Sequence, residues 1–257
     1  MHLRTPELDH LVIAAPSLEA GVIWCEQTLG VTPGPGGEHP LMGTHNRLAL
    51  ISSHSAPHAY LEIIAIDEQA TPTKPGQQSR WFGLDDPAMQ QQLQQYGPQL
   101  IHWVARVADL PQALAGAHRS GWDLGVVVHA SRMTSQGLLS WSIAVRPDGR
   151  LQAEGVMPTL IGWGEETHPT YSMAPSGLAI RELVCCHPQA AALNLVWHQA
   201  GGQLERFQAG PPKISALLET PRGPVLLESS PAATLRPGDM QASLTRVSRE
   251  PPAKEAH

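Results

Sequence analysis

Hydrophobic and polar residues alternate in the same way in two stretches of the chain, residues 8–30 and 100–121. Each stretch opens with apolar residues at every second position, which is the pattern of a β-strand with one buried face. The two stretches match when one is shifted by 92 residues, so we interpret them as two copies of one unit. The matched pairs are Leu8 and Leu100, His10 and His102, Val12 and Val104, Ser17 and Asp109, and Leu18 and Leu110.

A helix is predicted after each of these strands. Ser17 and Asp109 carry side-chain oxygens that can accept hydrogen bonds from the free amides of a helix's first turn. The residues that follow repeat an apolar side chain every three or four positions. Gly30 and Gly121 then stand where a helix commonly ends. The pattern therefore predicts a duplicated strand–helix start.

Further strands are predicted after each copy. Apolar runs bounded by turn residues favour strands at residues 47–51 and 59–66 in the first half, and at 125–129, 138–145 and 156–163 in the second. The order becomes β-α-β-β-β twice, although the second strand of the first copy is poorly marked. We therefore predict an α+β fold in which paired βαβββ modules form one curved sheet.

A third, partial α+β unit is predicted to follow the two modules. Residues 178–184 are strand-like, residues 189–199 favour a helix, and residues 214–228 favour a hairpin. The chain then becomes rich in proline and charge, as mobile tails are. The predicted boundaries are 1–98 for the first module and its linker, 99–172 for the second module, 173–230 for the third unit and 231–257 for a flexible tail.

The composition excludes several classes of protein. Among 257 residues, 42% are hydrophobic and 16% are charged, with 17 Lys+Arg against 23 Asp+Glu, which is typical of a globular domain. An acidic chain with a net charge of -6 is a poor candidate for nucleic-acid binding. No apolar run approaches the roughly 20 residues of a membrane helix. Three cysteines and no apolar leader segment favour the cytoplasm.

Two of the thirteen histidines stand at the same position of the repeat. His10 and His102 would face one another across a shared sheet, and neutral imidazole is the commonest metal ligand. Glu62 lies mid-strand among apolar residues, where a charge is costly unless it is paired or bound to a cation. Two histidines and one glutamate make a three-ligand site with open positions. We therefore predict a divalent metal site at His10, Glu62 and His102.

Plainer interpretations of these residues remain open. A single histidine in a strand is usually a satisfied core or edge residue, and Glu62 would be exposed if the strand register were shifted by one. Two more candidates open the next strand: Arg47 could hold a substrate carboxylate, and His45 could act as acid or base, although a solvated strand end explains His45 as well. Histidines at 39, 54 and 58 are expected in surface loops.

The sequence also resembles a known superfamily. LDHLVIAAPSLEAGVIWCEQTLG resembles the opening of the vicinal oxygen chelate superfamily, which includes glyoxalases and extradiol dioxygenases. MGTHNRLALI, YLEIIAI, SRWFGLD, GVMPTLIGW and HPT are similar to its glyoxalase-like domain family. The resemblance covers about residues 8–185. It implies a cup of paired modules, with His10, Glu62 and His102 as metal ligands.

One position departs from the pattern of the superfamily. The counterpart of Glu62 in the second half is expected within residues 160–163, where Gly162 has no side chain to offer. The four-ligand site of glyoxalase I is therefore not intact, and glyoxalase I activity itself is not implied.

The expected function is that of a glyoxalase-like metalloenzyme. A Zn, Fe, Mn or Ni ion would chelate neighbouring oxygens of a small-molecule substrate and stabilise an oxyanion, in isomerase, lyase or dioxygenase chemistry. The alternative is a metal-free protein that uses the same cup to bind or sequester a small molecule. An exposed edge of the third unit could pair two copies into a homodimer.

Overall fold

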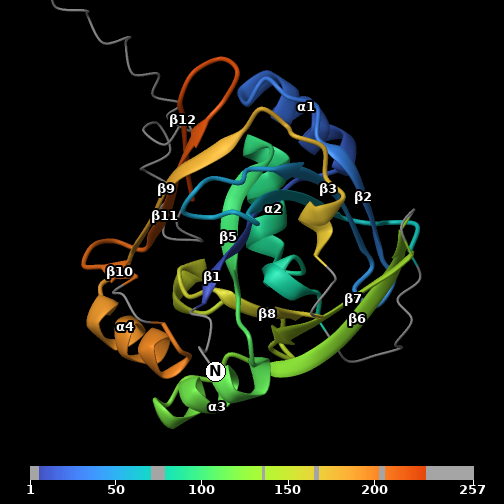
Figure 1. Ribbon diagram of the computed structural model, residues 1–257. Coiled ribbons are helices and arrows are strands. Elements are labelled where there is room, and N and C mark those ends of the chain that lie inside the picture. The colour runs from blue at the N-terminus through green and yellow to red at the C-terminus, as the bar shows by residue number, and fades with distance from the viewer. Residues whose placement is uncertain (1–5, 71–78, 135–136, 165–167, 203–205, 230–257) are drawn as a thin grey trace, which may run out of the picture.

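The computed structural model describes residues 6–70, 79–134, 137–164, 168–202 and 206–229, and the predicted tail at 231–257 lies outside these ranges. Figure 1 shows a large, strongly curved sheet with helices around its outside and a second, smaller sheet beside it. The predicted α+β class is confirmed.

The first half of the chain folds as one βαβββ module. α1 begins as expected, because the Ser17 side chain accepts a hydrogen bond from the amide of Ala20 at 3.1 Å. The second strand escaped the hydrophobic pattern because it is rich in glycine and mostly solvent-facing. The elements are β1 (Glu7–Ala14), α1 (Leu18–Thr28), β2 (Gly34–His39), β3 (Thr44–Leu50) and β4 (Tyr60–Ile66).

The second half repeats the same order of elements. Asp109 caps its helix by accepting a hydrogen bond from the amide of Gln112 at 2.8 Å. The strand predicted from residue 156 begins at Thr159, after a short 3-10 turn. The elements are β5 (Gln99–Arg106), α3 (Leu110–Arg119), β6 (Val126–Thr134), β7 (Gly137–Val145) and β8 (Thr159–Trp163).

The two modules meet at their first strands. The eight strands lie in the order β2-β3-β4-β1-β5-β8-β7-β6, so each module contributes its strands in the same internal order. β1 and β5 are antiparallel, with His10 opposite Val104 and Val12 opposite His102. His102 lies 92 residues after His10, and Val104 lies 92 residues after Val12, so exchanging the equivalent residues converts each pair into the other. A pseudo-twofold axis therefore runs through the centre of the sheet, and both repeat histidines lie beside it.

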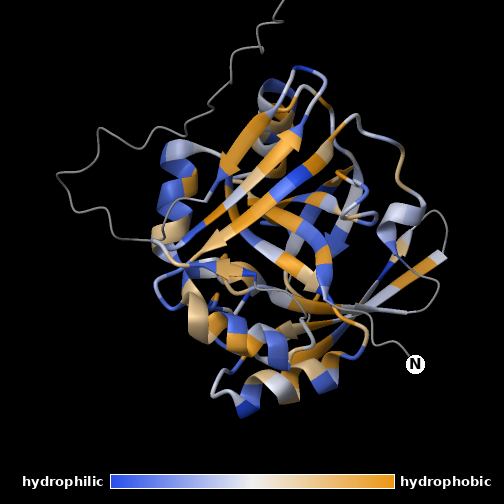
Figure 2. Ribbon diagram, turned by 60° about the vertical axis from the view of Figure 1, so that its left-hand side comes forward, coloured by the Kyte–Doolittle hydropathy of each residue, from blue (hydrophilic) through white to orange (hydrophobic). Residues whose placement is uncertain are grey.

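The two faces of the curved sheet have different partners. Leu11 and Ile13 point to the outer face, where α1 and α3 cover the strands, and both are fully buried. The fit is close, because a methyl group at Gly21 would lie 2.4 Å from Cγ2 of Ile63. Figure 2 shows that the strands carry much of the hydrophobic sequence, while the helices mix hydrophobic and hydrophilic residues. The concave inner face is left for other segments to fill.

Short connecting elements close over the inner face. They are η1 (Trp81–Gly83), α2 (Pro87–Tyr96), η2 (Ala153–Gly155) and η3 (Pro169–Tyr171). Trp81 and Phe82 pack against Val12, Ile64 and Val104 of the central strands. Phe82 has a φ of 58°, an unfavourable left-handed conformation for a bulky residue, at the point where both rings enter the cup. The cup is therefore partly filled by its own loop.

The third unit forms a separate sheet on the outside of the large sheet, where it contacts both modules, since the amide of Ile180 donates to the carbonyl oxygen of Ile51 at 2.9 Å. Its elements are β9 (Ala179–Cys186), α4 (Ala190–Gln199), β10 (Phe207–Gln208), β11 (Lys213–Glu219) and β12 (Val225–Glu228), with strand order β10-β9-β11-β12. Trp197 of α4 packs on Trp103 of β5, with ring centroids 5.8 Å apart. This unit therefore supports the outer face of β5 and does not cap the cup. In the described ranges, no helix has the length and apolar character needed to cross a membrane.

Gly116 tests the contact between the third unit and the second module. A methyl group at Gly116 of α3 would lie 1.9 Å from the backbone oxygen of Gln199 at the end of α4. Replacing a mid-helix glycine by alanine normally stabilises a helix by up to about 1 kcal/mol. We expect Gly116→Ala instead to lower the free energy of unfolding by about 1–3 kcal/mol, through overpacking. Chemical denaturation measures this free energy of unfolding, and Gln112→Ala, at an exposed position of α3, is the control. An unchanged or higher stability of the Gly116→Ala variant would contradict the close packing of α3 against α4.

Candidate functional site

A polar pocket lies inside the cup, lined by strands of both modules, and reaches the seam between β2 and β6. We call it the inner pocket. Its wall combines charged side chains with aromatic rings, an arrangement typical of sites for small ligands. The residues that line it are His10, His39, Asn46, Leu48, Tyr60, Glu62, Trp81, Phe82, Arg132, Leu139, Trp141, Ile143, Ile161, Trp163 and Pro169.

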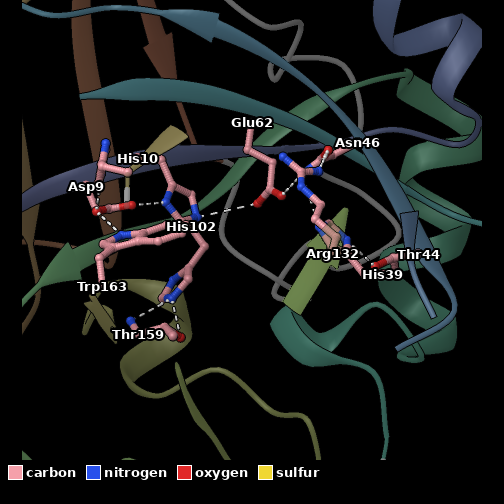
Figure 3. A network of polar contacts seen from close by, with 11 residues as sticks. Asp9, His10, His39, Thr44, Asn46, Glu62, His102, Arg132, Thr159 and Trp163 are labelled. Atoms are coloured by element: carbon pink, nitrogen blue, oxygen red, sulfur yellow. Dashed lines mark hydrogen bonds and ion pairs between the residues drawn. The ribbon is translucent and has the colours of Figure 1, made fainter. Parts of the chain in front are cut away.

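The floor of the inner pocket is a buried His10 held between two carboxylates. Its Nδ1 donates to Oδ1 of Asp9 at 2.7 Å, and its Nε2 lies 3.5 Å from Oε2 of Glu62 (Figure 3). Asp9 also accepts hydrogen bonds from Nε1 of Trp163 at 2.9 Å and from Nε2 of His168 at 3.1 Å. These contacts fix the orientation of the His10 ring and aim Nε2 at Glu62.

A β-bulge makes this arrangement possible. In the β1–β5 pairing Leu8 lies opposite Ala105 and His10 opposite Val104, so Asp9 is an extra residue without a partner on β5. A bulge re-aims a side chain that a regular strand would send to the other face. Asp9 and His10, which are neighbours in the sequence, can thus contact each other on the inner side of the sheet.

Burial and charge set the protonation states of this floor. Burial alone would lower the pKa of His10, but the hydrogen bonds to Asp9 and Glu62 outweigh it and raise the pKa to about 9. Burial would likewise raise the pKa of Glu62, but His10 lowers it below its ordinary value. At neutral pH, His10 is therefore an imidazolium between two ionised carboxylates, a buried arrangement that survives only because every member is paired.

A second hydrogen-bond network fixes the far oxygen of Glu62. Nδ2 of Asn46 donates to Oε1 of Glu62 at 2.6 Å and lies 3.3 Å from Nε2 of His39. Oδ1 of Asn46 accepts from Nη1 of Arg132 at 3.1 Å. Nδ1 of His39 lies 3.0 Å from the hydroxyl of Thr44, and burial lowers the pKa of His39 to about 4, so its ring is neutral. The prediction that His39 is a surface residue is wrong, because the glycine-rich β2 carries it into the pocket.

His102 occupies a different environment from His10. Its Nδ1 donates to the carbonyl oxygen of Gly155 at 2.7 Å, and its Nε2 accepts from the amide of Thr159 at 3.0 Å. Figure 3 shows the ring turned toward Thr159 and away from Glu62. Phe82 stands against His102, with ring centroids 5.6 Å apart, and His102 does not line the inner pocket. Burial lowers its pKa to about 3, so the ring is neutral.

The strand register corrects the counterpart of Glu62. β1 pairs with β4 so that Val12 lies opposite Glu62, and β5 pairs with β8 so that Val104 lies opposite Thr159. Val12 and Val104 are equivalent in the repeat, so Thr159 occupies the place of Glu62. The prediction that Gly162 is that counterpart is wrong.

The two modules therefore hold unequal versions of one arrangement. His10 faces the Glu62 carboxylate, whereas His102 faces the Thr159 hydroxyl, with Nε2 and Oγ1 3.0 Å apart. Gly162 has no part in it, since a Cβ there would face Leu110 of α3 on the outer side. One half of the pseudo-symmetric site is charged and the other half is neutral.

The predicted metal ligands do not fit a metal in this arrangement. His10 and Glu62 are brought together, but both ring nitrogens of His102 are engaged elsewhere. In the part of the chain that the structure describes, no three His, Cys, Asp or Glu side chains are grouped so as to hold a metal ion. The guanidinium of Arg132 also lies beside this network and carries the opposite charge to Glu62. The three-ligand site stays a prediction from the sequence.

The other two predicted site residues, His45 and Arg47, alternate along β3 with the residues that face the inner pocket. Asn46 and Leu48 line the inner pocket, whereas His45 is half-buried and Arg47 is exposed. Neither His45 nor Arg47 lines the inner pocket, and their catalytic roles stay predictions.

Two buried N–H groups of the inner pocket have no partner. Among the buried side-chain nitrogens of the described ranges, Nε1 of Trp81 and Nε of Arg132 make no hydrogen bond. An unpaired buried donor costs about 1–3 kcal/mol, so it indicates an acceptor that a water molecule or a bound ligand supplies. Sequence reasoning missed Asp9, Trp81, Arg132 and His168 because none repeats between the modules. Three of them lie in stretches quoted for the family resemblance, Asp9 in LDHLVIAAPSLEAGVIWCEQTLG, Trp81 in SRWFGLD and His168 in HPT.

Comparisons with known proteins agree with the fold. The sequence model of the Glyoxalase-like domain matches residues 8–201. A hypothetical protein from Staphylococcus aureus has a similar structure, with a TM-score of 0.52, 12% identity, and coverage of 87% of this chain and 85% of that chain. No curated protein sequence matches this chain.

Two methylmalonyl-CoA epimerases are more distant in structure. The enzyme from Streptomyces coelicolor, in complex with 2-nitronate-propionyl-CoA, has a TM-score of 0.41 and 17% identity over 65% of this chain and 100% of that chain. The enzyme from Mycobacterium tuberculosis has a TM-score of 0.37 and 16% identity over 68% of this chain and 97% of that chain. Likenesses this distant carry no argument about the activity of this chain.

The neutral state of His102 predicts how stability depends on pH. Its folded pKa of about 3 lies below the unfolded value of 6.5, so the unfolded chain binds the extra proton and stability falls as pH drops below 6.5. Between pH 7 and pH 5 we expect this residue to account for about 2 kcal/mol of lost stability. Over that interval the His102→Gln variant should lose about 2 kcal/mol less stability than the native chain. Urea denaturation at both pH values measures the difference. His118→Gln, on the exposed side of α3, is the control, and equal pH dependence of the His102 variant and the native chain would contradict the neutral buried ring.

Proposed function

Because this chain belongs to the glyoxalase-like domain family of the vicinal oxygen chelate superfamily, we propose that it is an enzyme that moves a proton on a small oxygen-rich substrate bound in the inner pocket. One observation carries the proposal. A buried acid–base pair, His10 and Glu62, shares a pocket with two buried N–H donors that have no partner, Nε1 of Trp81 and Nε of Arg132.

The unpaired donors favour an anionic oxygen of the substrate. Trp81 can give one hydrogen bond, and Arg132 can give one together with a positive charge. A carboxylate, or a carbonyl that becomes an enolate, would satisfy both donors and offset the cost of leaving them buried. A substrate with neighbouring oxygens could place one on these donors and another near Nε2 of His10. This class includes 2-oxo and 2-hydroxy carboxylates.

Proton transfer requires a base and an acid at neighbouring positions. Glu62 is ionised and can take a proton from the carbon next to the carbonyl group, while the electrons of that C–H bond move to the carbonyl oxygen. The protonated His10, together with Trp81 and Arg132, can stabilise the enolate oxygen that forms. Return of the proton to the same carbon from the other face, or to the adjacent atom, completes an isomerisation and restores the site.

A metal would change the chemistry of the same pocket. A divalent Zn, Fe, Mn or Ni ion on His10, Glu62 and His102 would supply Lewis-acid or oxygen chemistry. It would require His102 to give up its bonds to Gly155 and Thr159. No step above depends on such an ion. The remaining alternative is a binding protein, because the two free donors could hold an anion without any reaction.

Deuterium exchange tests the proposed reaction directly. The protein, treated with a chelator, is incubated in D2O with pyruvate, 2-oxobutanoate and 2-oxohexanoate, and loss of the C3 proton signal is followed by NMR. We expect enzyme-dependent exchange that Glu62→Gln slows by roughly 100- to 10,000-fold, since the base is lost. Trp81→Phe should raise KM roughly tenfold or more, since a donor to an anion is lost. Glu38→Gln, at an exposed glutamate of β2, is the matched control.

Three outcomes would overturn the proposal. Exchange that Glu62→Gln leaves unchanged would remove the assigned base. Saturable binding of all three acids without exchange would favour the binding protein. Exchange that appears only after loading with Zn, Mn, Ni or Fe(II), and disappears in His102→Ala, would replace the proposed mechanism by the metal site predicted from the sequence.

A further inference from the structure

The inner pocket is too small for a whole substrate. Its cavity volume is about 30 Å³, roughly the space that one water molecule occupies in the liquid. Pockets that enclose small ligands usually measure about 300–1,000 Å³. Only the oxygen-bearing end of a molecule can therefore reach Trp81 and Glu62, and the rest must lie elsewhere.

A larger cavity lies next to the inner pocket. We call it the outer vestibule; its volume is about 800 Å³, and it lies between β2 and β3, the β6–β7 hairpin and the η3 segment. In Figure 1 the hairpin ends beside β2 and β3. The two cavities adjoin, because four residues line both of them: Leu48, Arg132, Leu139 and Pro169.

The outer vestibule exposes large hydrophobic side chains that a folded chain usually covers. Met133 is 75% exposed, Leu138 59% and Tyr171 61%, and all three line this cavity. Met133 and Leu138 lie opposite each other in the β6–β7 hairpin, so their apolar surfaces adjoin. Contiguous exposed apolar side chains are a feature of surfaces that bind ligands or partners.

Arg132 stands at the junction of the two cavities. It reaches from β6 toward β2, where a methyl group at Gly37 would lie 2.5 Å from its Nη1. The glycine thus leaves the room in which the guanidinium lies against β2. Trp81 and Glu62 lie inward of this junction, and the exposed Met133, Leu138 and Tyr171 lie outward of it.

We infer that the substrate is an amphipathic acid, with its oxygen-bearing head in the inner pocket and an apolar chain in the outer vestibule. This inference rests on the proposed function for the position of the head. It adds that chain length determines specificity, through Met133, Leu138 and Tyr171.

A chain-length series measures this directly. Titration calorimetry with 2-oxobutanoate, 2-oxohexanoate and 2-oxooctanoate should give a Kd that falls roughly two- to fourfold for each added methylene, because each is removed from water. The double variant Met133→Ser with Leu138→Ser should flatten this trend and leave the Kd of 2-oxobutanoate within about twofold. Both side chains are exposed, so the fold is retained. Val126→Ser, at an exposed position on the other end of β6 that does not line the vestibule, is the matched control.

The outcomes separate the two proposals. If all three acids bound with a Kd that did not depend on chain length, the inference of an apolar substrate chain would be wrong, and the proposed function would still stand. If the double variant left the dependence of Kd on chain length unchanged, the placement of the apolar chain in the outer vestibule would also be wrong. Absence of binding at every length would remove both proposals together. If sedimentation showed that the double variant dissociates a dimer of the native chain, the apolar surface would belong to a second copy instead.

Discussion

Burial of the His10 imidazolium between two carboxylates is the constraint on which the rest of the site depends. Charges at this depth are costly unless each is paired, and the fold supplies the partners from separate segments. A bulge in β1 turns Asp9 toward His10, and Trp163 and His168 hold Asp9 in place. Asn46 holds Glu62 on the other side. Removing Asp9 or Glu62 would leave the buried charge of His10 poorly compensated, so the geometry that holds His10 and Glu62 is also a condition of stability.

The duplicated fold explains why this pair exists only once. The β1–β5 pairing makes the modules pseudo-symmetric, and each places a histidine beside the axis. The second module carries Thr159 where the first carries Glu62, so His102 is neutral and bonded within its own module. Phe82 stands against His102, and Trp81 and Phe82 line the inner pocket together with His10. The cup therefore holds one charged pocket beside one neutral, hydrogen-bonded histidine.

The sequence predicted the architecture better than the site. Alternation, capping residues and the repeat at 92 residues are local signals, and they identified β1, α1, β5 and α3. The repeat also singled out His10 and His102, but it could not say that Thr159 takes both bonds of Nε2. His39 was missed because β2 lacks an apolar pattern. Gly162 was misassigned because composition does not reveal how two strands are aligned, and the alignment of β5 with β8 gives this position to Thr159, three residues earlier. Arg132 meets Asn46 only through the closure of the sheet.

The central claim is that an anionic oxygen of a ligand completes the hydrogen bonds of Trp81 and Arg132. The indole N–H signals of the seven tryptophans in 15N-labelled protein test it most directly, with Trp81 assigned from its Trp81→Phe variant. Titration with 2-oxohexanoate should move the Trp81 indole proton downfield in a saturable way, with a smaller effect on the buried Trp103. A Trp81 signal that stays unchanged while the ligand binds would contradict the account.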